Sequence, residues 1–313
     1  MNNLNILVTG GIGFIGSNFC IHIIDKVSKL VIIDKFSYCS DISNINEIIS
    51  NEKVIVIKDD ITTCNMDDLL STYTINTVVH FAAQTHVDNS YNGFFDFVKD
   101  NILATHILLE SCKKNKNVSK ILMMSTDEVY GPSLETQLYE TSSFNPTNPY
   151  AASKASAEMI INAFKCSFSM PIIIMRCNNV YGPNQYHDKV IPRFIKQILN
   201  NEDITIHGNG SKTRDFIYVL DVCKAIECIL EKGIIGEIYN ISIDNPHTIN
   251  NLAILLSIKL QKELKIINII DRPFNDDRYY INSDKLRLLG WEPETSWDVG
   301  LHKTIEWINF KDL

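Results

Sequence analysis

The first sixteen residues hold the feature that most limits how this chain can fold. Residues 4–8 form a short apolar run typical of a buried strand, and a glycine-rich turn follows directly. Gly10, Gly13 and Gly16 permit a tight turn, close approach of the backbone to a pyrophosphate, and close packing of helix on strand. A helix running to about Lys26 would then present its N-terminus to the phosphates. The pattern predicts a strand–turn–helix unit that binds a dinucleotide, and a glycine turn without a ligand is the alternative.

A second apolar strand, residues 30–33, ends at Asp34, roughly twenty residues beyond the glycine turn. A carboxylate at this point binds both hydroxyls of a ribose and repels a 2′-phosphate. The predicted cofactor is therefore NAD, and Lys35 beside the carboxylate leaves NADP as an alternative. The predicted cofactor contacts are Gly10, Gly13, Phe14, Ile15, Gly16, Asp34, Lys35, Asp60, Ile61, Phe81, Ala82, Ala83, Tyr150 and Lys154.

Strands and helices alternate through the first half of the chain. Further strands are predicted at residues 54–57, 77–81, 121–124 and 171–175, and long helices at residues 94–114 and 150–168. This alternation implies an α/β fold with a Rossmann-type, doubly wound parallel sheet. Beyond Arg176 the elements become shorter. We therefore expect an NAD-binding domain over residues 1–176 and a smaller α/β substrate lobe over residues 177–313, with part of the sheet and helices interleaving between them.

Composition excludes several classes of function. A net charge of -8 makes a nucleic-acid backbone an unfavourable partner. No apolar run approaches the length of about 20 residues that spans a bilayer, so we expect a soluble, unexported, cytoplasmic protein and no membrane partner. The eight cysteines are scattered without a paired motif, and the eight histidines show no ligand spacing. Reduced thiols and no metal site are predicted.

Two adjacent carboxylates follow the strand predicted at residues 121–124. Thr126, Asp127 and Glu128 lie at the strand end where ligands bind in open α/β sheets. Alone, such residues indicate a solvated loop or a helix cap. Downstream of a dinucleotide fingerprint they become candidates for acid–base work, because neighbouring like charges tend to hold different protonation states.

A phenol and an ammonium follow in the next predicted helix. Pro149 suits the first helical turn, and Tyr150 and Lys154 would then share one face of the helix. A nearby ammonium should lower the pKa of the phenol from about 10 toward the working pH, which would make Tyr150 a usable base. Alone, the pair is more typical of a helix surface, and the dinucleotide fingerprint upstream reverses that interpretation.

Other polar side chains could hold a substrate. Thr85 and His86 follow the fourth predicted strand and could reach a sugar, although His86 alone is typical of a structural histidine. Arg214 and Arg272 could clamp a diphosphate by bidentate hydrogen bonds, and each taken singly is typical of a surface ion pair.

Taken together, the glycine turn, Ser125–Gly131 and Tyr150–Lys154 resemble the extended short-chain dehydrogenases/reductases over nearly the whole chain. Within them the sequence is most similar to nucleoside-diphosphate-glucose 4,6-dehydratases. Residues 34–40, 81–90 and 272–276 resemble the dehydratase domain of plant-type UDP-rhamnose synthases more than bacterial dTDP-glucose enzymes. Two departures from the bacterial pattern, His207 and Asn275, favour UDP over dTDP.

The resemblance implies a role for each catalytic residue. Tyr150, with Lys154 and Thr126, would take the proton of the glucose 4-hydroxyl while hydride passes to NAD. Glu128 would remove the C5 proton, protonated Asp127 would serve the departing 6-hydroxyl, and hydride would return to C6. NAD should stay tightly bound and be regenerated. The predicted substrate contacts are Thr85, His86, Asn179, Lys189, Pro192, His207, Arg214, Asn240, Arg272 and Asn275.

The resemblance also implies partners and leaves alternatives. Because the chain ends at Leu313, we expect a separate epimerase/reductase to convert the 4-keto-6-deoxy product to UDP-rhamnose or a related deoxysugar. A homodimer through a four-helix bundle of residues 94–114 and 150–168 is expected. The alternatives are a dTDP-glucose 4,6-dehydratase, a UDP-sugar 4-epimerase, a UDP-glucuronate decarboxylase and a non-catalytic NAD-binding regulator. The pair Asp127 and Glu128 argues for dehydration, since neither an epimerase nor a decarboxylase needs both carboxylates.

Overall fold

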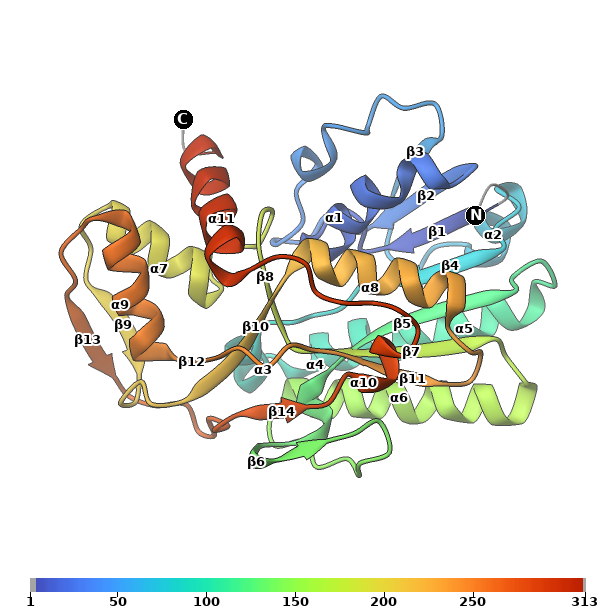
Figure 1. Ribbon diagram of the computed structural model, residues 1–313. Helices are drawn as coiled ribbons and strands as arrows, with labels where there is room; N and C mark the ends of the chain where they lie inside the picture. Colours follow the sequence, from blue (N-terminus) through green and yellow to red (C-terminus); the bar gives the residue numbers. More distant parts are fainter. Residues whose placement is uncertain (1–3, 312–313) are drawn as a thin grey trace.

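The computed structural model describes residues 4–311, and its centre is a parallel sheet of seven strands in the order β11-β7-β5-β4-β1-β2-β3 (Figure 1). Six of these strands were predicted, and the Rossmann-type fold class is confirmed. The strands are β1 Asn5–Thr9, β2 Lys29–Asp34, β3 Val54–Lys58, β4 Thr77–His80, β5 Lys120–Thr126, β7 Ile172–Cys177 and β11 Ile238–Ile241.

Helices cover both faces of this sheet. Successive side chains of a strand point to opposite faces, and because the strands are apolar on both, each face must be buried. Ile6 and Val8 of β1 pack in one core cluster with α1 and α8, whereas Leu7 packs in a second cluster with α5 and α6. Figure 1 shows α1 and α8 on one side of the strands and α5 and α6 on the other. The helices are α1 Phe14–Ile23, α2 Met66–Thr72, α5 Ala104–Lys114, α6 Pro149–Phe168 and α8 Val219–Lys232.

The seventh strand, β11, comes from the second half of the chain and was not predicted. It pairs with β7 in parallel, and α8, which precedes it, packs against α1. Residues 219–241 therefore complete the layers that the first half begins. The division into two domains at residue 176 stays a prediction. Residues 219–241 lie beyond that boundary but belong to the central sheet and its helical layer.

The helix predicted over residues 94–114 is continuous but not uniform. It consists of α4 Phe94–Phe97, a π-helical turn Val98–Leu103, and α5. A π-turn holds one residue more than an α-turn and often lies at a functional site. Here it buries Asn101, whose Nδ2 donates to Ser153 Oγ at 2.8 Å and whose Oδ1 accepts from Gln84 N at 2.7 Å. The wide turn thus ties α6 to the loop after β4.

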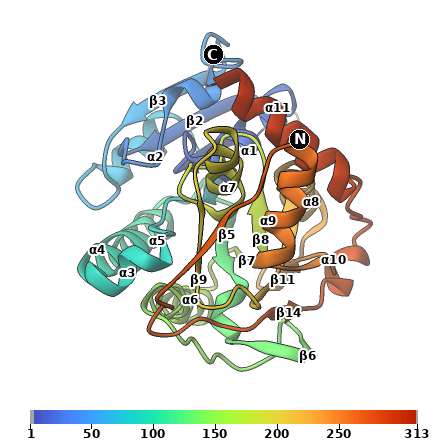
Figure 2. The same ribbon diagram turned by 90° about the vertical axis from the view of Figure 1, so that its left-hand side faces the viewer.

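The smaller lobe lies over the carboxyl ends of the sheet, on the left in Figure 1 and facing the viewer in Figure 2. It has its own core, formed largely by α7, α9, β9 and α11. Its elements are α7 Val190–Leu199, β9 Ile204–His207, α9 Ile249–Leu260, β13 Ile266–Ile269 and α11 Trp297–Lys311. Short elements join lobe and sheet: α3 Val87–Asn92, β6 Ser133–Leu138, β8 Asn179–Tyr181, β10 Thr213–Tyr218, β12 Pro246–Thr248, β14 Tyr279–Ile281 and α10 Asp284–Arg287.

Between residues 4 and 311 no helix is long and apolar enough to cross a membrane. The same residues contain no group of three His, Cys, Asp or Glu side chains that could hold a metal ion. All eight cysteines are free thiols, and Cys20, Cys112, Cys177 and Cys223 are buried.

Candidate active site

A cavity of about 420 Å³ lies between the carboxyl ends of the sheet and the lobe. It brings together all the predicted catalytic and cofactor residues and eight of the ten predicted substrate residues. The segments that follow β1, β2, β3, β4 and β5, together with α6, supply the first two groups. The substrate residues that line it are Thr85, His86, Asn179, Lys189, His207, Arg214, Arg272 and Asn275.

Two predicted substrate residues, Pro192 and Asn240, do not line the cavity. Pro192 is buried in α7 among the core of the lobe. Asn240 is fully buried in β11, where its Oδ1 accepts from Tyr130 OH at 2.8 Å and its Nδ2 donates to Asn282 O at 2.9 Å. Its amide is fully used inside the protein, so Asn240 serves packing at the sheet edge.

The glycine turn leaves room that side chains would fill. Gly10 has a φ of +67°, and a Cβ there would lie 2.7 Å from Ala82 N. A Cβ on Gly16 would lie 2.2 Å from Gly10 O. No side chain caps the N-terminus of α1, which leaves its first N–H groups available to an anion. The turn fits a pyrophosphate.

Asp34 and Lys35 define the ribose end of the cavity. Asp34 Oδ1 accepts from Phe36 N at 2.9 Å, and burial raises the pKa of its carboxyl group. Lys35 Nζ forms an ion pair with Asp100 of the π-helical turn, and Gln84 Nε2 donates to the same carboxylate at 2.7 Å. Because its charge is engaged there, Lys35 is poorly placed to favour a 2′-phosphate.

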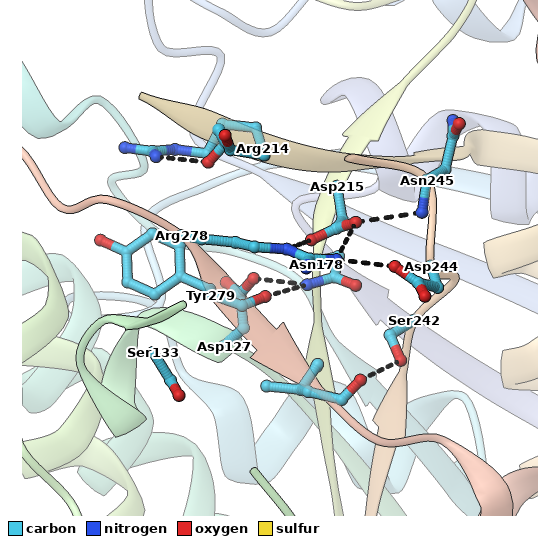
Figure 3. Close-up of polar contacts among 12 residues, drawn as sticks. Asp127, Ser133, Asn178, Arg214, Asp215, Ser242, Asp244, Asn245, Arg278 and Tyr279 are labelled. Atoms are coloured by element: carbon cyan, nitrogen blue, oxygen red, sulfur yellow. Dashed lines mark hydrogen bonds and ion pairs between the residues drawn. The ribbon is translucent and has the colours of Figure 1, made fainter. Parts of the chain in front are cut away.

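Asp127 begins the 3-10 turn that follows β5 and is almost fully buried. Its carboxylate accepts from Thr126 Oγ1 at 3.1 Å. It also accepts from Asn178 Nδ2 at 2.7 Å (Figure 3). Burial and the neighbouring Glu128 raise the pKa of Asp127 to about 7. This carboxyl group can therefore hold a proton near neutral pH, as a general acid must.

Glu128 has a different set of partners. Asn148 Nδ2 donates to its Oε2 at 2.8 Å, and the hydroxyl of Tyr279 lies 3.4 Å from the same oxygen. Asn148 Oδ1 also accepts from Ala151 N at 2.9 Å, which caps α6. Burial is the main cause that raises the pKa of Glu128. One asparagine thus links this carboxylate to the helix that carries Tyr150.

Tyr150 and Lys154 lie on one buried face of α6, as predicted, but the prediction for the phenol's pKa was wrong. Burial, followed by the charge of Glu128, raises the pKa of Tyr150 above its usual value. Lys154 Nζ donates to Met124 O at 2.8 Å, and burial lowers the pKa of this lysine to about 8. The sequence showed the helical spacing but not that the phenol is desolvated beside two carboxylates.

The cationic wall of the cavity joins the lobe to the first half of the chain. Arg272 Nε lies 2.6 Å from Asp88 Oδ1, and the other guanidinium arm donates to Oδ2 at 2.9 Å. Lys189 Nζ donates to Thr85 O at 2.8 Å. One arm of Arg214 donates to the backbone oxygens of Thr213 and Asp276, at 2.7 and 2.9 Å. Arg214 and Arg272, which were predicted to clamp a diphosphate, both line this cavity. Each donates to oxygen atoms of the protein.

Sequence reasoning missed three side chains that contact the two acids, Asn148, Asn178 and Tyr279, and it missed Asp276, which contacts Tyr279. Asn148 precedes Pro149 at the start of α6, a recognisable cap position, so its role was available from the sequence. The others approach the carboxylates from residues far away in the chain, and local patterns hold no sign of this.

The parallel sheet, the glycine turn and the Tyr150–Lys154 face together define the class of Rossmann-type short-chain dehydrogenases/reductases. A family model described as GDP-mannose 4,6 dehydratase matches residues 7–304. The chain belongs to this family.

Relatives and solved structures agree with that assignment. The trifunctional UDP-glucose 4,6-dehydratase/UDP-4-keto-6-deoxy-D-glucose 3,5-epimerase/UDP-4-keto-L-rhamnose-reductase RHM1 of Arabidopsis thaliana is 42% identical over 97% of this chain. The chain spans only 46% of that relative's length. The dTDP-D-glucose 4,6-dehydratase of Homo sapiens is 41% identical over 96% of this chain and 89% of its own.

Two solved structures show how widely the fold is shared. The dTDP-glucose 4,6-dehydratase DesIV of Streptomyces venezuelae, solved with NAD, has a TM-score of 0.94 at 30% identity over 98% of this chain and 97% of its own. The UDP-glucose 4-epimerase of Thermotoga maritima reaches 0.92 at 30% identity over 99% of this chain and 100% of its own. The overall fold therefore does not separate dehydratases from epimerases.

Proposed function

We propose that this chain is an NAD-dependent nucleoside-diphosphate-glucose 4,6-dehydratase that prefers UDP-glucose and forms UDP-4-keto-6-deoxyglucose. The observation that carries the proposal is the buried pair Asp127 and Glu128 in the same cavity as Thr126 and Tyr150. Removing water from a hexose needs one acid and one base besides the groups that serve the 4-hydroxyl. The pair has two different sets of partners, which suits two roles.

At the 4-hydroxyl, Tyr150 is the proton acceptor and Thr126 the hydrogen-bonding partner. NAD, when bound, supplies a positively charged ring that takes hydride from C4 and later returns it to C6. Residues Gly10 to Gly16 would hold its pyrophosphate and Asp34 its ribose. Tyr150 needs such a neighbouring positive charge, because burial alone raises the pKa of its phenol.

At C5 and C6 the two carboxyl groups divide the work. A ketone at C4 acidifies the hydrogen on C5, and Glu128 removes that proton. Asp127, which holds a proton near neutral pH, protonates the departing 6-hydroxyl. Glu128 then gives a proton back to C5. Each of these three proton transfers uses only the two carboxyl groups and the sugar.

The choice of UDP rests on His207 and Asn275. Both line the cavity: His207 Nδ1 lies 3.1 Å from Ile270 O, and Asn275 Oδ1 lies 3.4 Å from a guanidinium nitrogen of Arg214. A dTDP-glucose 4,6-dehydratase is the second candidate, since relatives named for UDP-glucose and for dTDP-glucose are 42% and 41% identical to this chain.

A homodimer through the helices predicted for it has support from the surface. Phe95 of α4, Met159 of α6 and Phe168 at the end of α6 are large apolar side chains exposed by 77%, 60% and 52%. The helices α5 and α6 pack against each other. A second copy would cover these side chains in a four-helix bundle. The cytoplasmic location stays a prediction.

One incubation tests the proposal. Purified protein with NAD is given UDP-glucose, dTDP-glucose, UDP-galactose and UDP-glucuronate separately, and products are identified by mass and NMR. We expect loss of one water from UDP-glucose, faster than from dTDP-glucose, and a 4-keto product. Faster turnover of dTDP-glucose would overturn the nucleotide preference. Interconversion of UDP-glucose and UDP-galactose without water loss would make the chain an epimerase, and no turnover would favour a regulator.

A further inference from the structure

Glu128 Oε2, the Tyr279 hydroxyl and Asp276 Oδ2 form a row of three oxygen atoms, with the phenol between two carboxylates. The Tyr279 hydroxyl lies 3.4 Å from Glu128 Oε2 and donates to Asp276 Oδ2 in a closer contact. All three residues are at most 9% exposed. With both carboxylates ionised, one phenolic proton must serve two contacts. The shorter contact takes it, so no proton lies between the phenol oxygen and Glu128 Oε2, whose donor is Asn148 Nδ2 at 2.8 Å.

Asp276 and the backbone beside Tyr279 are held by further contacts. Asp276 Oδ1 accepts from Thr147 Oγ1 at 2.7 Å, and the backbone oxygen of Asp276 accepts from Arg214 at 2.9 Å. Arg278, the residue before Tyr279, binds Asp215 of β10 with nitrogen–oxygen distances of 2.8 and 2.9 Å (Figure 3). This ion pair fixes the backbone beside Tyr279, whose side chain lines the cavity.

Burial favours uptake of a proton by Glu128, whereas the charges around it act in both directions. The titratable and charged groups that face it from the surrounding elements are Asp127, Tyr150, Lys189, Arg214, Asp276 and Tyr279. Asp276 raises the pKa of Glu128, while Arg214 and Lys189 lower it. Burial is the largest cause and also acts upward. A proton arriving on Glu128 would complete the row, because Glu128 could donate to Tyr279 while Tyr279 donates to Asp276.

We propose that Tyr279 and Asp276 are positioning residues that stabilise the protonated form of Glu128 between removal of the C5 proton and reprotonation of C5. This inference rests on the proposed function. In the forward step the C5–H bond breaks, the electron pair stays with the sugar, and the proton sits on Glu128 with Tyr279 as acceptor. In the return step the same oxygen of Glu128 gives a proton to C5. No oxidant or further reactant is needed.

The test uses the NAD-loaded full chain in deuterated water with UDP-glucose. The variants are Tyr279→Phe and Asp276→Asn, and the matched control is Tyr280→Phe, whose ring lies against Arg278 instead. Three rates are measured: formation of bound reduced cofactor, deuterium incorporation at C5, and release of keto sugar across a range of pH. Thermal unfolding checks each variant's folding.

Both variants should form reduced cofactor at the wild-type rate but incorporate deuterium at C5 about tenfold more slowly or worse. The acid limb of turnover should move to lower pH by about one unit, since Glu128 loses the partner of its protonated form. Tyr280→Phe should match wild type in all three rates. Equal slowing of cofactor reduction and C5 exchange, or an unmoved acid limb, overturns the proposal. Absence of keto-sugar release by the wild type would instead overturn the proposed function.

Discussion

The loop after β1 and the turn after β5 lie at the same edge of one sheet, yet they are built in opposite ways. The first works by leaving side chains out: a Cβ on Gly10 or Gly16 would meet backbone atoms closer than 3 Å. The second crowds a hydroxyl and two carboxyl groups into a buried turn. A ligand phosphate needs bare backbone N–H groups, whereas proton transfer needs side chains whose protonation the surroundings set.

The largest effect should come from removing the acids of the second region. Asp127→Asn and Glu128→Gln should each slow water loss by roughly 10²-fold or more, because each removes one proton-transfer group. Formation of bound reduced cofactor should persist in both. Rapid mixing with UDP-glucose, followed by product analysis, separates the two steps. The control is Glu135→Gln, an exposed carboxylate on β6. Unchanged turnover in both variants would remove the roles assigned to the pair.

Adding one methyl group tests the opposite design of the first region. Gly16→Ala places a Cβ 2.2 Å from Gly10 O, a backbone atom that cannot move aside alone. We expect the free energy of unfolding to fall by about 3 kcal/mol and NAD binding to be lost. Gly93→Ala is the matched control, since its Cβ would lie 3.7 Å from the nearest atom. Denaturant unfolding and cofactor titration measure both effects, and equal behaviour of the two variants would contradict the steric reading.

Burial of Asp127 in the turn after β5 should lower the stability of the folded protein at and above neutral pH. Its pKa is about 7 in the folded chain against an ordinary value of 3.8, so the folded state binds the extra proton. The stability that this proton confers is full below about pH 4 and is lost as pH rises through 7. Asp127→Asn should therefore gain stability relative to wild type across that window, by roughly 2 kcal/mol at pH 8. Thermal unfolding at several pH values measures it. A difference independent of pH would show that Asp127 is ionised throughout.

The smallest expected effect concerns Asp34, the carboxylate predicted to bind the ribose of the cofactor. Asp34→Asn should weaken NAD binding about tenfold, since hydrogen bonds to a charged acceptor are worth roughly 1.5 kcal/mol or more. NADP binding should weaken less, because the repulsion of a 2′-phosphate is removed. Titration of cofactor-free protein with each dinucleotide measures the ratio. An unchanged ratio would indicate that Asp34 does not face the ribose.

The features that the sequence predicted and those that it missed differ in whether they depend on local or on distant residues. The glycine turn, β1 to β5, β7 and the Tyr150–Lys154 face depend on neighbours within a few residues, and all were predicted at or near their observed bounds. Strand β11 was missed because Ile238–Ile241 is short and joins the sheet only through pairing with β7. Asn240 was assigned to the substrate for the same reason: its burial depends on that pairing.

The sequence by itself determined which chemical groups are present and which strand ends carry them, because strand, turn and helix signals are local. Only the tertiary structure decided their state. It turned Tyr279 and Asp276 toward Glu128, set Asn178 against Asp127, and buried Tyr150 beside both acids. The physical reason is that a protonation state depends on the distance to other charged groups and on the exclusion of water. Both are set by residues that are far apart in the chain and meet only in the folded protein.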